Sequence, residues 1–148
     1  QVTDVQPTGN INTPLNPVLL AIAAGGGFVA RAFSGDKEHL VSIMKQAILY
    51  NGYALVDILQ PCVSFNKVNT FSYYSKRVYR LDDGYDASDK AAAMQKAMEY
   101  GDRIPIGVIY QEQKRTFHEK NKVLSGGVPL IDKPADLSTV QHLADEFI

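Results

Sequence analysis

The only cysteine of the chain, Cys62, lies in the segment LQPCVSFN, directly after a run of apolar residues typical of a buried strand. A thiolate can act as a nucleophile or bind a soft metal ion, and either task needs partner residues. Pro61 stiffens the approach to Cys62. The side chains of Gln60, Ser64 and Asn66 could donate hydrogen bonds to a thiolate or a sulfide. Without such partners, a lone cysteine is more often a small buried apolar residue.

Other candidate residues give weaker signals. No partner at metal-ligand spacing accompanies His39, His118 or His142, so we interpret all three as surface or core residues. Asp57 is a charge in an apolar strand and needs a partner there, and we favour a structural partner over a role in a site. The glycines at 25–27 follow a helix and precede a strand, which predicts a turn and not a phosphate loop.

The segment after Cys62, NKVNTFSYYSKRVYRLDDG, interleaves basic and aromatic side chains. A solvated loop anchored by its aromatic rings would have this composition. The alternative is a docking surface for an acidic protein, since charge complementarity steers such encounters. The cations that would form it are Lys67, Lys76, Arg77 and Arg80.

Hydrophobic periodicity predicts the elements that must position these residues. Helices are expected over 17–24, 36–50 and 90–100, and strands over 28–33, 54–59 and 104–110. Short joints between helices and strands predict an α/β fold, a parallel sheet with flanking helices. Pro105 and Gly107 favour the start of a strand or an edge position for the third strand.

The chain is expected to divide near residue 112. Residues 1–112 form the α/β domain, and residues 113–148 form a polar tail with a terminal amphipathic helix. That helix is predicted to begin at Ser138, which starts a capping-box pattern with Gln141. Its apolar face would bury Val140, Leu143, Ala144 and Phe147.

Composition excludes several classes of function. The 148 residues carry a net charge of -1, which gives no reason to expect a nucleic acid or an anionic membrane surface as partner. The longest apolar run, residues 18–24, is too short to cross a bilayer. One cysteine fits a reducing compartment, so we expect a cytoplasmic protein. The start, without Met and rich in proline, suggests a piece of a longer chain.

Three segments together resemble the carboxyl-terminal half of the β subunit of 2-oxoacid:ferredoxin oxidoreductases. They are QPTGNINTPLNPVLLAIAAGGGFVAR, LVDILQPCVSFNKVNTFSYYSKRVY and DRIPIGVIYQEQKRTFHE, and the resemblance covers about residues 7–119. These thiamine-diphosphate enzymes decarboxylate a 2-oxoacid oxidatively, form acyl-CoA and pass electrons through iron–sulfur clusters to ferredoxin. The resemblance implies the carboxyl-terminal part of a thiamine-diphosphate-binding fold.

The resemblance also implies a role for Cys62. In the family, the cysteine of the LQPC segment is one of four thiolate ligands of a 4Fe–4S cluster, and the other three lie upstream. The family's diphosphate and magnesium site uses a Gly-Asp-Gly segment and a later asparagine, which are absent from this sequence. We therefore assign no catalytic, thiamine-diphosphate or magnesium contact to any residue, and expect this chain alone to be inactive and to bind no cofactor.

The partners that the resemblance implies are an α subunit, ferredoxin, coenzyme A and a 2-oxoacid. The segment LQPCVSFN favours family members that act on 2-oxoglutarate or on several 2-oxoacids over members that act on pyruvate alone. The alternative is a non-catalytic α/β interaction module derived from such a subunit. In either case we expect a homodimer, because apolar helix residues would lack a cover. Those residues are Leu19, Ile22, Ile43 and Ile48.

Overall fold

A computed structural model describes residues 6–133 and 137–147 of the chain. The chain divides into two units, the α/β unit Gln1–Lys114 and the tail unit Arg115–Ile148. The elements of the α/β unit are, in order, α1 (Pro17–Ala23), β1 (Phe28–Phe33), α2 (Lys37–Leu49), β2 (Ala54–Leu59), α3 (Phe71–Ser75), β3 (Val78–Arg80), α4 (Lys90–Met98) and β4 (Ile104–Gln111). No helix among the described residues is long and apolar enough to cross a membrane.

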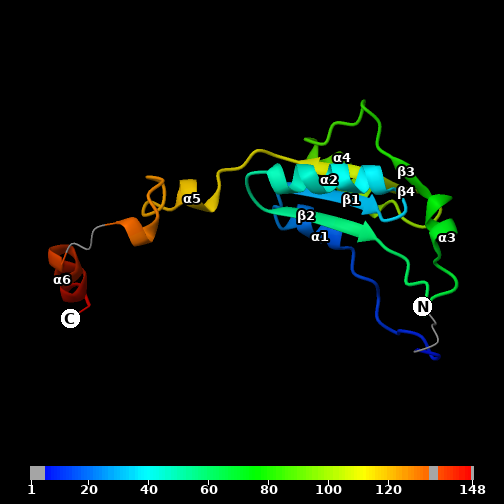
Figure 1. Cartoon of the computed structure of the whole chain (residues 1–148), viewed down its shortest axis with the longest axis horizontal. Coiled ribbons are helices and arrows are strands. Elements are labelled where there is room, and N and C mark those ends of the chain that lie inside the picture. Colours follow the sequence, from blue (N-terminus) through cyan, green and yellow to red (C-terminus); the bar gives the residue numbers. More distant parts are fainter. Residues whose placement is uncertain (1–5, 134–136, 148) are drawn as a thin grey trace. The chain divides into compact units, whose positions relative to one another are not determined.

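The α/β class is confirmed, but the sheet is mixed and not wholly parallel. Its strand order is β2-β1-β4-β3 (Figure 1). The pairs β1–β2 and β3–β4 are parallel, whereas β1 and β4 run antiparallel. A return to a parallel strand needs a crossover of a dozen or more residues, usually a helix across the sheet. The segment after β2 instead forms only α3, a helix of five residues, and β3 starts from the edge at which β2 ends.

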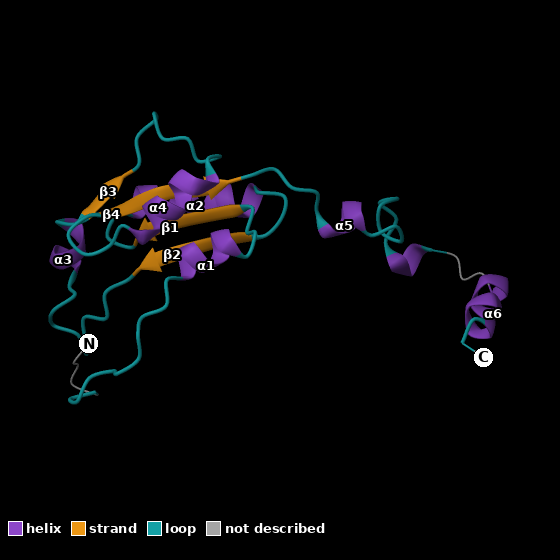
Figure 2. Ribbon diagram, turned by 180° about the vertical axis from the view of Figure 1, so that it is seen from behind, coloured by secondary structure: helices purple, strands orange, loops and turns teal. Residues whose placement is uncertain are grey.

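Helices cover both faces of the sheet (Figures 1 and 2). Side chains of a strand point alternately to opposite faces. Phe28, Ala30 and Ala32 therefore pack with Ile43 of α2. Val29 points the other way and packs with residues of α1 and α4. All six residues of β1 are buried, which makes this strand the centre of the core.

The helix ends follow from side-chain caps. Asn16 Oδ1 accepts a hydrogen bond from the backbone N–H of Leu19 at 3.0 Å, and Asn16 Nδ2 donates to the carbonyl of Ala97 at 2.8 Å. One side chain thus starts α1 and joins it to α4. After α1, Gly25 has a positive φ of 87° and its N–H donates to the carbonyl of Ile22. The prediction of a turn at these glycines is confirmed.

Of the two alternatives for the third predicted strand, the edge position is wrong, because β4 lies between β1 and β3, whereas Pro105 does lie at the start of the strand as its second residue. Ile104 N–H donates to Arg77 and the carbonyl of Ile106 accepts from Leu81, so these two residues hydrogen-bond towards β3. Pro105 faces the other way, and the pairing of β4 with β1 extends only from Gly107 onward. The missing N–H of Pro105 consequently breaks no bond of the sheet.

The predicted uncovered face also needs correction. Ile22 and Ile43 are buried, because α1 and α2 turn these side chains towards the sheet. Leu19 is partly buried against the core, and of the four residues predicted to lack a cover only Ile48, at 77%, is largely exposed. The apolar surface that remains on α2 is formed by Val41, Met44, Ile48 and Leu49.

The tail unit contains three short elements, α5 (Phe117–Lys120), the 3-10 helix η1 (Leu130–Asp132) and α6 (Leu137–Asp145). A capping box between Thr116 and Glu119 starts α5. Ser138 lies inside α6 and not at its cap position. The expected burial of its apolar face is wrong, because the described part of the tail offers no second layer to cover it. The four residues that were expected to be buried are all exposed, namely Val140, Leu143, Ala144 and Phe147.

Candidate functional site

The polar and reactive groups gather along one edge of the sheet, here called the Cys62 edge. It consists of the loops after β1 and β2 and those before β3 and β4. The register places these four loops together, because β1 and β2 end where the antiparallel β4 begins, and β3 begins beside β4. Ligands of open α/β sheets commonly bind beyond the carboxyl ends of strands. This edge is therefore the place where a site is expected.

Cys62 is exposed in the loop three residues after β2, so its interpretation as a buried core residue is wrong. The backbone carbonyl of Cys62 accepts a hydrogen bond of 2.9 Å from the N–H of Asn66. Asn66 Oδ1 in turn accepts from the N–H groups of Val68 and Asn69, at 2.9 and 3.0 Å. The side chain of Asn66 thus braces the loop that carries the thiol.

The donor set at Cys62 fits one ligand of a shared metal cluster. Among residues 6–133 and 137–147, no group of three or more His, Cys, Asp or Glu side chains could hold a metal ion. A 4Fe–4S cluster takes four thiolates, and this sequence has one. An exposed thiol on a braced loop can supply one of the four if another segment supplies the rest.

Asp57 has the structural partner that the sequence predicted. Arg31 Nε and Asp57 Oδ2 are 2.9 Å apart, and the side chains of these residues are 2% and 22% exposed. They face each other across the register of β1 and β2. Arg31 Cζ lies 5.8 Å from the centre of the Tyr100 ring. The charge of Asp57 also acts on Tyr74 of α3. The pKa of Tyr74 is raised to about 12 by burial, by a hydrogen bond to Tyr100 and by this nearby charge.

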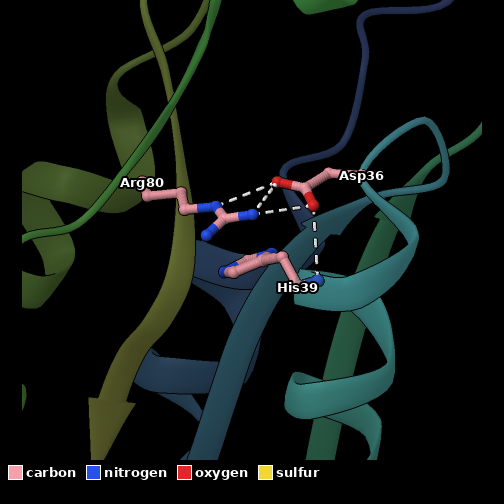
Figure 3. Close-up of polar contacts among 3 residues, drawn as sticks. All are labelled: Asp36, His39 and Arg80. Atoms are coloured by element: carbon pink, nitrogen blue, oxygen red, sulfur yellow. Dashed lines mark hydrogen bonds and ion pairs between the residues drawn. The ribbon is translucent and has the colours of Figure 1, made fainter.

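A second ion pair joins the start of α2 to β3 (Figure 3). Arg80 Nε lies 2.9 Å from Asp36 Oδ2, and Arg80 Nη2 lies 2.8 and 2.7 Å from the two carboxylate oxygens. Asp36 also caps α2 by accepting from the N–H of His39 at 3.3 Å. Burial of Asp36 alone would raise its pKa, but these hydrogen bonds hold it below its usual value. Burial lowers the pKa of His39.

Tyr79 of β3 is the centre of a third polar group. Its hydroxyl donates to the carboxylate of Glu99, and Lys96 Nζ lies 2.7 Å from the other oxygen of that carboxylate. Arg103 Cζ lies 4.6 Å from the centre of the Tyr79 ring. Burial and the bond to Glu99 raise the pKa of Tyr79. The group thus joins the end of α4 to β3 and to the residue before β4.

The basic and aromatic segment is partly built into the fold. Arg80 is paired with Asp36, and Arg77 stacks on Tyr73 with 3.8 Å between its Cζ and the ring centre. Arg77 also lies 3.8 Å from Asp102. Of the four cations expected to dock a partner, Lys67 and Lys76 are exposed and form no ion pair among the described residues, and Lys67 Nζ donates to the carbonyl of Val63 at 2.7 Å. Docking of an acidic protein by these four cations stays a prediction.

Sequence reasoning missed Arg31 and Arg103. For Arg31 a signal existed, because one base in the apolar strand FVARAF matches one acid in the apolar strand ALVDIL. Two lone opposite charges in adjacent buried strands predict a pair. For Arg103 no signal existed, because its contact with Tyr79 depends on the pairing of β3 with β4.

Comparison with known proteins identifies the family. The family model for the C-terminal region of the pyruvate ferredoxin oxidoreductase beta subunit matches residues 62–126. A 2-oxoacid:ferredoxin oxidoreductase subunit beta from Saccharolobus solfataricus is 40% identical over 139 residues, which cover 86% of this chain and 45% of the relative. The 2-oxoacid:ferredoxin oxidoreductase 1, subunit beta, from Aeropyrum pernix is 39% identical over 147 residues, covering 92% of this chain and 46% of the relative.

A solved structure agrees with these sequence relatives. The 2-oxoglutarate:ferredoxin oxidoreductase from Magnetococcus marinus, with 2-oxoglutarate, coenzyme A and succinyl-CoA bound, matches with a TM-score of 0.83 and 29% identity. The match covers 97% of this chain and 49% of that chain. The present chain thus spans about half the length of the curated relatives first matched. It belongs to the family of 2-oxoacid:ferredoxin oxidoreductase β subunits.

Proposed function

We propose that this chain is part of the β subunit of an enzyme that converts a 2-oxoacid and coenzyme A into acyl-CoA and carbon dioxide. The reaction releases one proton and two electrons, and ferredoxin takes the electrons. The observation that carries this proposal is the 40% identity to a β subunit over 86% of the chain. The non-catalytic interaction module is not favoured, because these relatives are named as oxidoreductase subunits.

Cys62 is proposed as one thiolate ligand of a 4Fe–4S cluster in the complete enzyme. Support comes from its exposure and from its place beyond the end of β2. A bound cluster of this kind supplies a one-electron relay. What this chain's residues do is hold the thiol in place, through the bond from Asn66 to the Cys62 carbonyl and the bracing bonds of the Asn66 side chain.

Thiamine diphosphate and magnesium are proposed for the complete enzyme and not for this chain. The sequence lacks a Gly-Asp-Gly segment, so no residue here is given a contact with either. This chain alone is proposed to be inactive and to bind no cofactor. As substrate we favour 2-oxoglutarate or several 2-oxoacids, since the Magnetococcus marinus neighbour has 2-oxoglutarate and coenzyme A bound.

The proposed partners are an α subunit and ferredoxin, and we place the enzyme in the cytoplasm. The words "subunit beta" in the names of the relatives support the first partner, and "ferredoxin" in the same names supports the second. A homodimer of this chain is proposed on the strength of the exposed apolar residues of α2, of which Ile48 is 77% exposed.

The test is an anaerobic assay of the complete enzyme with a set of 2-oxoacids, coenzyme A and oxidised ferredoxin. We expect ferredoxin reduction that requires both coenzyme A and a 2-oxoacid, with 2-oxoglutarate among the substrates accepted. Absence of ferredoxin reduction with every 2-oxoacid, in enzyme that contains its cofactors, would contradict the proposed function.

A further inference from the structure

Four cations at the Cys62 edge are paired with carboxylates of the chain, namely Arg31, Arg77, Arg80 and Lys96. Lys67 and Lys76 are exposed, but a lysine lacks the fixed fork of donors that a guanidinium offers. Arg80 lies 2.7 Å from a carboxylate oxygen of Asp36, and Lys96 lies 2.7 Å from one of Glu99. A cation in such a pair has little net charge left for a partner, because its own carboxylate occupies the same donors. A docking surface must therefore use cations that lack this compensation.

Arg103 is such a cation. It is exposed, it directly precedes β4, and no ion pair within residues 6–133 and 137–147 includes it. Its guanidinium lies over Tyr79 with Cζ 4.6 Å from the ring centre. Glu99 lies within electrostatic reach, but its oxygens are bonded to Lys96 and Tyr79.

The ring beneath Arg103 orders the side chain without removing its charge. A cation over an aromatic face is held electrostatically, and the planar guanidinium keeps its edge donors in a fixed fork. That fork matches a carboxylate, which can accept two parallel hydrogen bonds. An open pocket of about 380 Å³, lined by Lys96, Glu99, Tyr100, Asp102 and Arg103, lies at the same place and leaves room for a partner's side chain.

The position is suited to electron transfer. Arg103 comes just before the first residue of β4, and Cys62 lies three residues after the last residue of β2, at the same edge of the sheet. Only β1 separates these two strands, so with neighbouring strands about 4.8 Å apart their ends are about 10 Å apart. A protein that docks on Arg103 would thus lie beside the loop of Cys62.

We propose that Arg103, held over Tyr79, is a docking residue for a carboxylate on the surface of the electron-accepting protein. The inference rests on the proposed function, in which that acceptor is ferredoxin. It assigns the specific contact to a residue outside the basic and aromatic segment, because the arginines of that segment are engaged with Asp36, Tyr73 and Asp102.

The test compares Arg103→Gln with wild type in the complete enzyme. We expect kcat/KM for ferredoxin to fall about 5-fold to 10-fold at low ionic strength, and the difference to shrink in about 0.5 M salt, where steering is screened. Reduction of methyl viologen, a small acceptor without carboxylates, should not change.

Lys45→Gln is the matched control, because Lys45 is an exposed cation of α2 outside the proposed surface. An equal kcat/KM for ferredoxin in Arg103→Gln and wild type would overturn the proposal and leave the proposed function intact. Loss of viologen reduction in Arg103→Gln would also overturn it, since the residue would then act on folding or chemistry. A wild-type enzyme that reduces viologen but not ferredoxin would contradict the proposed function itself.

Discussion

The buried pair of Arg31 and Asp57 fixes how β1 and β2 are aligned at the Cys62 edge. Removing the carboxylate would leave a guanidinium that is 2% exposed without its counter-charge. Breaking a buried pair in this way costs about 3 kcal/mol. Because Asp57 lies in β2, the strand that precedes Cys62, loss of the pair would destabilise that strand directly.

We accordingly predict that Asp57→Asn lowers the free energy of unfolding of the chain by about 3 kcal/mol, measured by urea denaturation. Arg31→Met should cost less, because the remaining carboxylate is 22% exposed and can be hydrated. Asp83→Asn, at an exposed position, is the control. A change below about 0.5 kcal/mol in Asp57→Asn, the range of ordinary surface substitutions, would show that the pair is not structural.

The stability of the chain should also depend on His39. Burial lowers the pKa of His39 in the folded state, so the unfolded chain binds the proton more tightly. The contribution of His39 to stability is then complete above its ordinary pKa of 6.5 and is lost as the pH falls through the folded value. Urea denaturation from pH 8 to 5 should reveal this loss in wild type. A His39→Gln variant with the same pH dependence as wild type would contradict this prediction.

Individual residues were predictable from the sequence when their own surroundings in the chain carried the signal. Asp57 needed a partner because its strand is otherwise apolar, and the structure supplies Arg31. The contact between Arg103 and Tyr79 was not predictable, because it joins residues of two strands whose pairing the sequence did not reveal.

At the scale of elements, the longer strands and helices follow from periodicity and caps. β1 and β2 have the predicted bounds, since each is a short, mainly apolar run of six residues with a single charge, flanked by glycine or polar residues. β3 was missed because three residues carry no period. The direction of β4 was missed for a related reason: it depends on α3, a helix too short to cross the sheet.

The start of α4 offers a test of capping. Asp89 Oδ1 accepts hydrogen bonds from the N–H groups of Ala91 and Ala92, at 2.9 and 3.0 Å. Asp89→Ala leaves both donors without this partner and should cost about 1 kcal/mol. Because α4 packs against α1 through Ala93 and Ala97, the loss should appear as a lower urea midpoint of the whole transition. Asp83→Ala is the control, and equal midpoints for the two variants would argue against the cap.

At the scale of the whole molecule, exposed apolar side chains favour association. Val41, Met44 and Ile48 recur at helical spacing on the outer side of α2 and are 52%, 38% and 77% exposed. We predict that the chain dimerises at tens of micromolar, a concentration that corresponds to a binding free energy of about 6 to 7 kcal/mol. Sedimentation velocity should show the dimer in wild type and a monomer in Ile48→Lys. A wild-type chain that stays monomeric would be evidence against a homodimer.

The central claim is that Cys62 supplies a thiolate to an iron–sulfur cluster of the complete enzyme. Its direct test is the iron content of Cys62→Ser beside wild type, with the visible absorbance of the cluster and ferredoxin reduction measured on the same samples. Serine exchanges a soft thiolate for a hydroxyl that binds iron poorly. We predict that the variant loses the cluster of the β subunit and fails to reduce ferredoxin, while cofactor binding and the first decarboxylation largely survive. Full iron content with normal ferredoxin reduction in Cys62→Ser would contradict the claim.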